Sequence, residues 1–494
     1  MLQSYESTRS LNLKASASKA VLKGIADDGG LYVMRELDSK KIGIESLINK
    51  SYVEIAELVL KEMLDDFSEE KIKECVNKAY TNKFSTEEII PIVKVNNSYI
   101  AELFHGPTSA FKDVALSILP HLMTASYEMN DIEGEVLILT ATSGDTGKAA
   151  LEGFRDVKGT KIAVFYPDGG VSQVQKSQME TQEGSNVYVC AIKGNFDDAQ
   201  TGVKKIFTDK ALINELQENS ILFSSANSIN IGRLVPQIVY YFYSYVKLVE
   251  NKAIDMWDKV NFSVPTGNFG NILAGYYAKM LGLPVNKLIC GSNENNVLYD
   301  FIKDGVYDRN RKFYKTISPS MDILVSSNLE RLLYYMSGKD NNEVKELMDA
   351  LNSSGKYEVS QEMKNRIDSD FYAGCVFEDD TEKTIKDTFE KYGYLLDTHT
   401  AVAYKTLEEY RNNTKDETVS IVLSTASPYK FSKSVYESLY GKSNKEEFEI
   451  MEELSARTGV CIPKNLKGLN MKPILHKEVC EINEMEKYVR KIAK

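Results

Sequence analysis

The chain has few of the residues that build metal sites and disulfide frameworks. Its 494 residues include six cysteines and four histidines, and no two cysteines form a C-x-x-C pair. The histidines and cysteines also lack the spacing of a zinc site. We therefore expect reduced thiols and no resident metal ion.

Long hydrophobic runs and an excess of positive charge are also missing. No stretch approaches the length of a membrane span, and the N-terminal segment MLQSYESTRS lacks the apolar run of a signal peptide. The net charge is −11, with acids and bases mixed along the chain. Nothing in this charge distribution attracts nucleic acid or an anionic membrane. We expect a cytoplasmic protein with neither of these partners.

What the sequence does contain is an α/β pattern. Apolar residues make up 43% of the chain and charged residues 27%, which is typical of soluble globular proteins. Alternating strands and helices predict parallel sheets, which bind ligands beyond the carboxyl ends of their strands. Short β-branched or apolar runs, most of them separated by amphipathic stretches, predict strands at 136–140, 162–166, 187–192, 221–224, 260–264, 288–290 and 420–423.

Three regions are expected in chain order. Residues 1–95 form a mainly helical N-terminal domain, residues 96–220 a smaller α/β domain, and residues 221–494 a larger α/β domain. These boundaries are approximate, and the domains can be discontinuous. The segment at about 330–390 is rich in Asn, Lys, Asp and Glu with helical spacing, so we interpret it as a helical insertion.

A lysine at the start of a helix is the first candidate for chemistry. The segment HGPTSAFKD (105–113) ends a turn and opens an apolar helical stripe, which places Lys112 in the first helical turn. The positive end of the helix dipole disfavours a charged amine there, and a lysine with a lowered pKa can form a Schiff base. A lone lysine in such a place is more often a solvated side chain.

Two glycine-rich loops follow predicted strands. In ATSGDTGKA (141–149), glycines and hydroxyls at a helix start can hold an anion, with an ordinary tight turn as the alternative. The loop lacks the glycine spacing and the Ser or Thr after Lys of a P-loop, which argues against an NTPase. In PTGNFGN (265–271), two glycines before a helix form a phosphate cup. A third glycine is missing, which disfavours NAD.

A third strand-end loop offers hydroxyl groups. LSTASP (423–428) ends a strand with hydroxyls before a helix opened by proline, where hydroxyls commonly serve as caps. A neutral hydroxyl is also a suitable partner for a pyridine nitrogen. Together with a Schiff-base lysine, a phosphate cup and a second anion-binding turn, it completes what a pyridoxal phosphate enzyme requires.

The chain closely resembles the threonine synthase family, of the pyridoxal phosphate fold type II group. The resemblance implies two parallel-sheet α/β domains with pyridoxal 5'-phosphate between them. It also implies conversion of O-phospho-L-homoserine and water to L-threonine and phosphate through aldimine and ketimine intermediates, the last step of threonine biosynthesis. It covers almost the whole chain, through STRS, DDGGLYV, HGPTSAFKD, TSGDTGKAA, SSANSINIGR, VPTGNFGNILAG, DTHTAVA and STASPYKF.

The resemblance implies a role for each site residue. Lys112 would hold the cofactor aldehyde and then act as acid and base. Further cofactor contacts would come from Asp145 beside the ring, Thr425 facing the pyridine nitrogen, and the cup of Gly267, Asn268, Phe269, Gly270 and Asn271. We assign the binding of the substrate phosphate to Thr108, Ser109, Thr142, Ser143, Thr146, Asn230 and Arg233. The alternatives are a helix cap for Asn230, a surface ion pair for Arg233 and a loop anchor for Asp145.

The chain departs from the family pattern at four positions and leaves other functions open. Gly, Pro, His and Ala are usual where this sequence has Ser10, Thr398, Ser427 and Tyr429. One rival is a related phospho-lyase or dehydratase that does not add water at Cβ. Another is a catalytically silent binding protein, which the intact Lys112 disfavours. We expect a monomer or homodimer.

Overall fold

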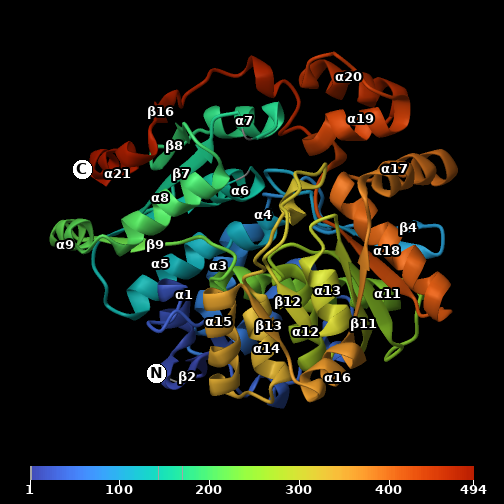
Figure 1. Cartoon of the computed structure of the whole chain (residues 1–494), viewed down its shortest axis with the longest axis horizontal. Coiled ribbons are helices and arrows are strands. Elements are labelled where there is room, and N and C mark those ends of the chain that lie inside the picture. The colour runs from blue at the N-terminus through green and yellow to red at the C-terminus, as the bar shows by residue number, and fades with distance from the viewer. Residues whose placement is uncertain (1–2, 143, 170, 494) are drawn as a thin grey trace.

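The computed structural model describes residues 3–142, 144–169 and 171–493, and two β-sheets form the centres of its two lobes (Figure 1). The larger sheet has the order β14-β11-β10-β15-β5-β4 and is parallel except for the antiparallel pair β4 and β5. Its strands are, in that order, Phe371–Cys375, Val285–Ser292, Val260–Pro265, Ser420–Ser424, Ser98–Glu102 and Ile92–Val95.

The smaller sheet has five strands, all parallel, in the order β16-β8-β7-β6-β9. Parallel strands are covered by helices on both faces, which explains why the central strand β7 is buried except for one lysine. In sheet order, the strands are Glu478–Cys480, Val187–Ile192, Thr160–Pro167, Glu135–Ala141 and Ile221–Ser224.

Helices surround both sheets (Figure 1). Those of the smaller lobe are α4 (Lys112–Leu116), α5 (Leu119–Met129), α6 (Asp145–Phe154), α7 (Gln173–Glu180), α8 (Phe196–Thr208), α9 (Lys210–Glu218) and α21 (Met485–Ala493). Those of the larger lobe are α10 (Ile231–Leu234), α11 (Ile238–Glu250), α12 (Gly270–Met280), α13 (Val297–Asp304), α14 (Leu329–Met336), α15 (Asn341–Ser354), α16 (Gln361–Asp370), α17 (Glu378–Tyr392), α18 (Thr398–Thr414), α19 (Ser432–Tyr440) and α20 (Glu447–Thr458).

The N-terminal region contains helices and a small antiparallel sheet. Helix α2 begins with a capping box between Ser51 and Glu54, and Ser68 caps α3. Because apolar residues recur on one side of each helix, both helices bury that side. The elements are β1 (Tyr5–Ser7), β2 (Ser10–Ala15), α1 (Ala17–Lys23), β3 (Tyr32–Met34), α2 (Tyr52–Met63) and α3 (Glu69–Tyr80).

The predicted α/β class and all the predicted strands are confirmed. The expected insertion at about 330–390 is mainly helical but also contains β13 (Lys356–Glu358) and β14, which pairs with β11 at the edge of the larger sheet. The strong charge of the surrounding helices hid this short strand. The domain boundaries stay a prediction, although strand pairing places β5 in the larger sheet and β9 and β16 in the smaller one.

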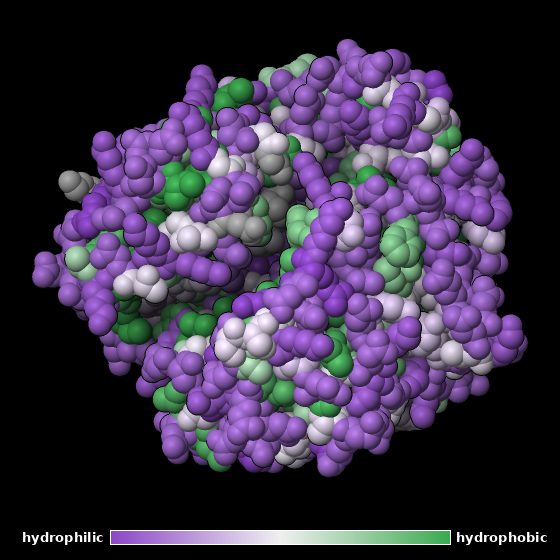
Figure 2. Space-filling model, viewed as in Figure 1, coloured by the Kyte–Doolittle hydropathy of each residue, from purple (hydrophilic) through white to green (hydrophobic). Residues whose placement is uncertain are grey.

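The two lobes leave a hollow between them. Figure 2 shows the surface hollowed between the smaller lobe and the rest of the molecule, and a mostly hydrophilic exterior in this view. Among the described residues, none of the helices is both long and apolar enough to cross a membrane.

Candidate active site

Four strand-end loops supply the candidate site. HGPTSAFKD follows β5, STASP follows β15 and PTGNFGN follows β10, and these three strands are neighbours in the larger sheet. Their carboxyl ends therefore open at the same edge, as expected for a parallel sheet. The fourth loop, SGDTG, follows β6 of the smaller sheet and leads into α6.

Backbone hydrogen bonds join two of these loops. The Phe111 N–H donates to the Thr425 carbonyl (2.9 Å), and the Ser427 N–H donates to the Ser109 carbonyl (3.1 Å). An isolated bridge between Ala110 and Ala426 lies between them. Thr425 is thus fixed beside the first turn of α4, and its place opposite the pyridine nitrogen stays a prediction.

Lys112 is the first residue of α4 and is mostly buried, with 13% of its side chain exposed. Its Nζ lies 3.4 Å from Ser320 Oγ and 3.8 Å from Asp145 Oδ2. Burial lowers the pKa of Lys112, the charges of Arg233 and Lys430 lower it further, and Asp145 opposes them. The direction of the pKa shift agrees with the prediction. Its main cause, however, is burial and not the dipole of α4, a helix of only five residues.

A buried ion pair lies next to this amine. Lys430 is fully buried, and its Nζ lies 2.9 Å from Asp145 Oδ1. Gln175 Nε2 also donates to Asp145 Oδ1 (2.9 Å). Although burial opposes ionisation, the charges of Lys430 and Lys112 and these hydrogen bonds hold the pKa of Asp145 well below its usual range. Asp145 is therefore a carboxylate, anchored from two sides.

Lys430 also holds the loop that precedes Lys112. Its Nζ donates to the Thr108 carbonyl and to Gln178 Oε1, both at 3.0 Å. The Thr108 hydroxyl and N–H in turn donate to the buried Asp113 carboxylate (2.5 and 2.8 Å). Burial raises the pKa of Asp113 to about 6, against the lowering effect of these hydrogen bonds. Sequence reasoning assigned no role to Lys430 or Asp113.

The predicted phosphate cup, residues 267–271, spans the start of α12 and approaches the Lys112 site through Ser320. A Cβ on Gly267 would lie 2.5 Å from the Ser320 carbonyl oxygen, so only glycine fits there. Phe269 takes a left-handed conformation (φ 60°), and Asn328 Nδ2 donates to the Asn268 carbonyl (3.0 Å). These constraints shape the backbone at the start of the helix, where N–H groups favour an anion.

Unpartnered donors accompany the cup. Tyr240 and Tyr241 donate to Asn271 Oδ1 (2.6 and 3.1 Å), whereas the buried Asn271 Nδ2 has no hydrogen-bond acceptor within the described part of the chain. A Cβ on Gly270 would make ordinary van der Waals contact with the Asn328 and Gln237 amides, the nearest atom at 3.4 Å. An orphaned buried donor beside a loop at a helix start suits an anionic ligand.

Arg233 is a second such donor. It is 4% exposed, its Nη1 donates to the Ala226 carbonyl (2.8 Å), and its Nε has no acceptor among the described residues. Burial lowers the pKa of Arg233 to about 10. No carboxylate of the described chain forms an ion pair with it, so the alternative of a surface ion pair is wrong. A buried guanidinium in this state suits an anionic ligand.

The other predicted substrate contacts are engaged within the protein or are not tested. Asn230 caps α10 through the Gly232 N–H (2.8 Å) and donates to the Val21 carbonyl (2.9 Å), so the capping alternative describes its geometry. Ser109 Oγ donates to Asn465 (2.9 Å). Thr142 Oγ1 accepts from the N–H groups of Gly144 and Gly147 (3.0 and 2.9 Å).

Two further predicted residues lie in the same turn. Thr146 is half-buried in the first turn of α6, and Ser143 lies outside the described residues. For all these side chains, contact with a substrate phosphate stays a prediction.

His399 is a site residue that sequence reasoning missed. Its Nε2 accepts from the Ser320 N–H (3.1 Å), and its Nδ1 lies 3.1 Å from Asp397 Oδ1. This hydrogen-bond pattern places the ring proton on Nδ1. The imidazole thereby holds the Ser320 segment that contacts Lys112. The only sequence signal was its place in the motif DTHTAVA.

Comparisons with known proteins agree on one family. The model for "Threonine synthase N terminus" matches residues 4–80, and that for "Threonine synthase, C-terminal" matches residues 400–493. Threonine synthase of Saccharomyces cerevisiae is 36% identical over 474 residues, covering 90% of both chains. A human relative, "Threonine synthase-like 1", is 38% identical over 94% of this chain, which spans only 62% of that protein's length.

A solved structure extends the similarity from sequence to fold. The structure of threonine synthase from Brucella melitensis, described as PLP bound, aligns with a TM-score of 0.88 and 36% identity over 99% of each chain. The larger and smaller parallel sheets, and the loops at their carboxyl ends, thus have a counterpart that spans the whole molecule. This chain belongs to the threonine synthase family.

Proposed function

We propose that this protein is a threonine synthase, a pyridoxal phosphate-dependent lyase that converts O-phospho-L-homoserine and water to L-threonine and phosphate. The observation that carries the proposal is a buried amine of lowered pKa, Lys112, near a glycine loop with an orphaned donor, Asn271 Nδ2. The relatives that cover most of this chain support it. We propose a cytoplasmic monomer or homodimer, with the three domains set out above.

The residues fit pyridoxal phosphate. Lys112 would bind the aldehyde, and the backbone of residues 267–271 with Asn271 Nδ2 would hold the phosphate. Thr425 would face the pyridine nitrogen with a neutral hydroxyl. When bound, the cofactor supplies the electron sink for a carbanion at Cα of the substrate.

Lys112 and its neighbours would perform the proton transfers. Its lowered pKa leaves more of the amine neutral near pH 7, so Nζ can accept the Cα proton, give that proton up and then accept a Cβ proton. The ionised Asp145 keeps a fixed negative charge near that nitrogen, which stabilises the ammonium group that forms whenever Nζ accepts a proton. Arg233 would bind the leaving phosphate, whose departure from Cγ requires donors throughout.

One experiment separates the candidate functions. The purified protein is mixed with O-phospho-L-homoserine after its visible absorption is recorded. We expect a visible band from lysine-bound cofactor, followed by threonine and phosphate in equal amounts. A keto acid with phosphate would instead identify a lyase that adds no water, and absence of the band would favour a silent binding protein.

The Lys112→Ala variant tests the assignment of the lysine. We expect it to fold, to bind cofactor only reversibly and to lose the visible band and the activity. Lys433→Ala, at an exposed lysine on α19, is the matched control and keeps both. A covalent cofactor adduct that persists in Lys112→Ala would refute the assignment.

A further inference from the structure

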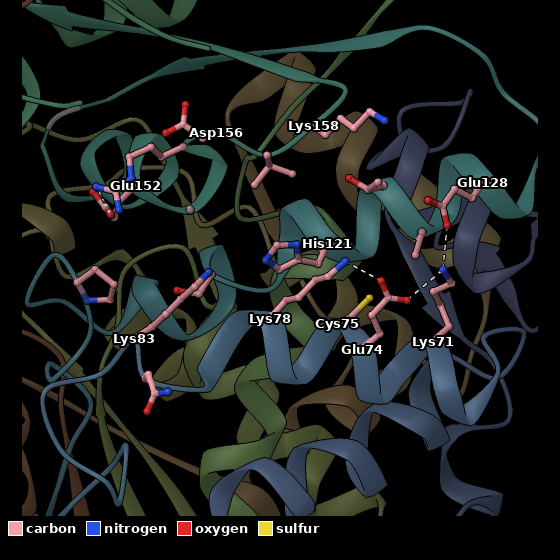
Figure 3. Close-up of a pocket in the computed structure, with 18 residues that line it drawn as sticks. Lys71, Glu74, Cys75, Lys78, Lys83, His121, Glu128, Glu152, Asp156 and Lys158 are labelled. Carbon is pink, nitrogen blue, oxygen red and sulfur yellow. Dashed lines mark hydrogen bonds and ion pairs between the residues drawn. The ribbon is translucent and has the colours of Figure 1, made fainter. Parts of the chain in front are cut away.

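A surface pocket that Lys112 does not line lies between α3, α5 and the end of α6, and Pro107 of the Lys112 loop forms part of its wall. Its volume is about 570 Å³, enough for a small molecule. Figure 3 shows side chains of these three segments converging on it, with the His121 ring between the ends of Lys78 and Lys83 in this view.

The charges that line this pocket do not cancel locally. Three of its acids are already in ion pairs: Glu74 with Lys78 and Lys71, Glu128 with Lys71, and Glu152 with Arg155. The fourth, Asp156, accepts from Ser185. Two lining lysines, Lys83 and Lys158, have no ion-pair partner among the residues that the structure describes. Because Asp156 also lacks an ion pair, the five basic and four acidic lining residues leave one net positive charge.

His121 contributes an unsatisfied polar atom to this site. Its Nε2 is buried without a hydrogen-bond partner in the described part of the chain. Burial lowers the pKa of His121 to about 4, and the charges of Lys83 and Lys78 lower it further. Burial also lowers the pKa of Lys83. Lys83 and the His121 Nε2 thus lack a partner within the described residues, and an anion that binds them would compete with Glu74 for Lys78.

We propose that this pocket binds a small phosphate-bearing anion at Lys78, Lys83 and His121, and that the bound ligand acts on the helix that carries Lys112. A phosphate group offers enough acceptor oxygens to reach two lysines and an imidazole N–H together. The phosphate can be the free inorganic ion or the phosphoryl group of a small organic phosphate. Both share the chemistry that these side chains recognise.

The coupling has a direct structural basis. Helix α4 begins at Lys112, and its C-terminal cap, Ser117, lines the pocket, only about 8 Å along the helix. Tyr80, on α3, donates to the Val114 carbonyl of α4 (2.9 Å). A Cβ on Gly153, another lining residue, would lie 2.0 Å from the Leu116 carbonyl oxygen, so α6 contacts the same helix without free space. A ligand that draws α3 towards α6 must therefore move or tighten α4.

Histidine NMR tests the binding. The chain has only four histidines, so the imidazole signals of the holoenzyme can be resolved, and His121→Gln identifies the signal of interest. We expect millimolar inorganic phosphate or O-phospho-L-serine to raise the pKa of His121 from about 4, in a saturable manner. A response to one of the two compounds identifies the source of the phosphate group. No shift with either compound overturns the proposal.

Matched variants locate the effect. Lys83→Gln should weaken phosphate binding, measured by the same His121 signal, about tenfold. Lys73→Gln removes an equal charge from an exposed position on α3 that does not line the pocket, and should leave binding unchanged. Equal weakening by both variants would show mere long-range attraction and would also overturn the proposed site.

Hydrogen exchange tests the coupling. Phosphate should slow amide exchange over residues 112–117 in the wild-type protein. The slowing should be lost in Lys83→Gln but kept in Lys73→Gln, which distinguishes this pocket from phosphate bound near Lys112. Slowing that persists in Lys83→Gln, or binding without slowing, would refute the coupling.

Discussion

At the scale of single residues, the site depends on how buried charges are compensated. Lys112, Asp145 and Lys430 form one line of alternating charge, with 3.8 Å and 2.9 Å between successive charged atoms. Burying a charged amine costs the free energy of its hydration. Without the carboxylate between them, nothing would offset this cost for either lysine. The arrangement keeps Asp145 ionised, while burial lowers the pKa of Lys112.

Removing Lys430 should therefore change the chemistry of Lys112. In Lys430→Met, loss of a nearby positive charge and release of Asp145 both raise the pKa of Lys112. Capture of pyridoxal phosphate by the cofactor-free protein needs the neutral amine. We expect the pH profile for the rate of appearance of the visible band to move to higher pH.

The controls separate this effect from instability. Lys433→Met, at an exposed position, should leave the profile unchanged. Breaking the buried pair should also cost about 3–5 kcal/mol of unfolding free energy, so Lys430→Arg, which keeps the charge, should restore the wild-type profile if it folds. A profile that is unmoved in folded Lys430→Met would contradict the charge argument.

At the scale of elements, α4 is positioned by close backbone contacts rather than by its own length. It has five residues and no side-chain cap. Its partners are α6, which carries Asp145, and the strand-end segment at Ala426, which bridges to Ala110. A helix this short is stable only through such tertiary contacts.

Gly153→Ala tests the contact between α4 and α6. The new Cβ would lie 2.0 Å from the Leu116 carbonyl oxygen, and this overpacking should outweigh the better helix propensity of alanine. We expect a net loss of about 1–3 kcal/mol in urea unfolding, together with a weaker visible cofactor band as Asp145 moves relative to Lys112. Gly43→Ala, where the nearest atom is 3.9 Å away, is the control. Equal stability of the two variants would show that α4 and α6 can move apart at Gly153 without loss of unfolding free energy.

At the scale of the whole molecule, the C-terminal segment ties the two lobes together. After α20 the chain returns to the smaller lobe, where β16 adds to β8 and α21 covers the sheet (Figure 1). On the way, Asn465 contacts Ser109 and the Pro107 carbonyl in the Lys112 loop (2.9 and 2.6 Å). The smaller lobe is thus completed only by the end of the chain.

Val489→Ala tests this dependence. Val489 is fully buried with Phe165 in the core of the smaller lobe, and its truncation should cost about 2 kcal/mol. Hydrogen exchange should rise in β6 to β8 but not in β10 or β15. Ile482→Ala, at a residue that is 39% exposed, should change little. Faster exchange throughout both sheets would instead show that the lobes unfold as one unit.

Local sequence patterns and motifs were enough to predict much of the fold and the start of the Lys112 helix. Hydrophobic alternation identified the strands, because buried parallel strands are short apolar runs between turns. The glycine loop at 265–271 predicted the phosphate cup, since a helix start without side chains is suited to a phosphate; the loop lies at the start of α12, and its role stays a prediction. The start of α4 at Lys112 followed from the apolar stripe behind it.

Only the tertiary structure decided which charges meet. Lys430, His399 and Ser320 lie far from Lys112 in sequence, and only folding brings them close to it. The same holds for β14 and β16, short strands that form only because a sheet edge is available to them. Periodicity is a property of neighbours along the chain, whereas burial and electrostatic compensation depend on neighbours in space, and these set the chemistry of Lys112.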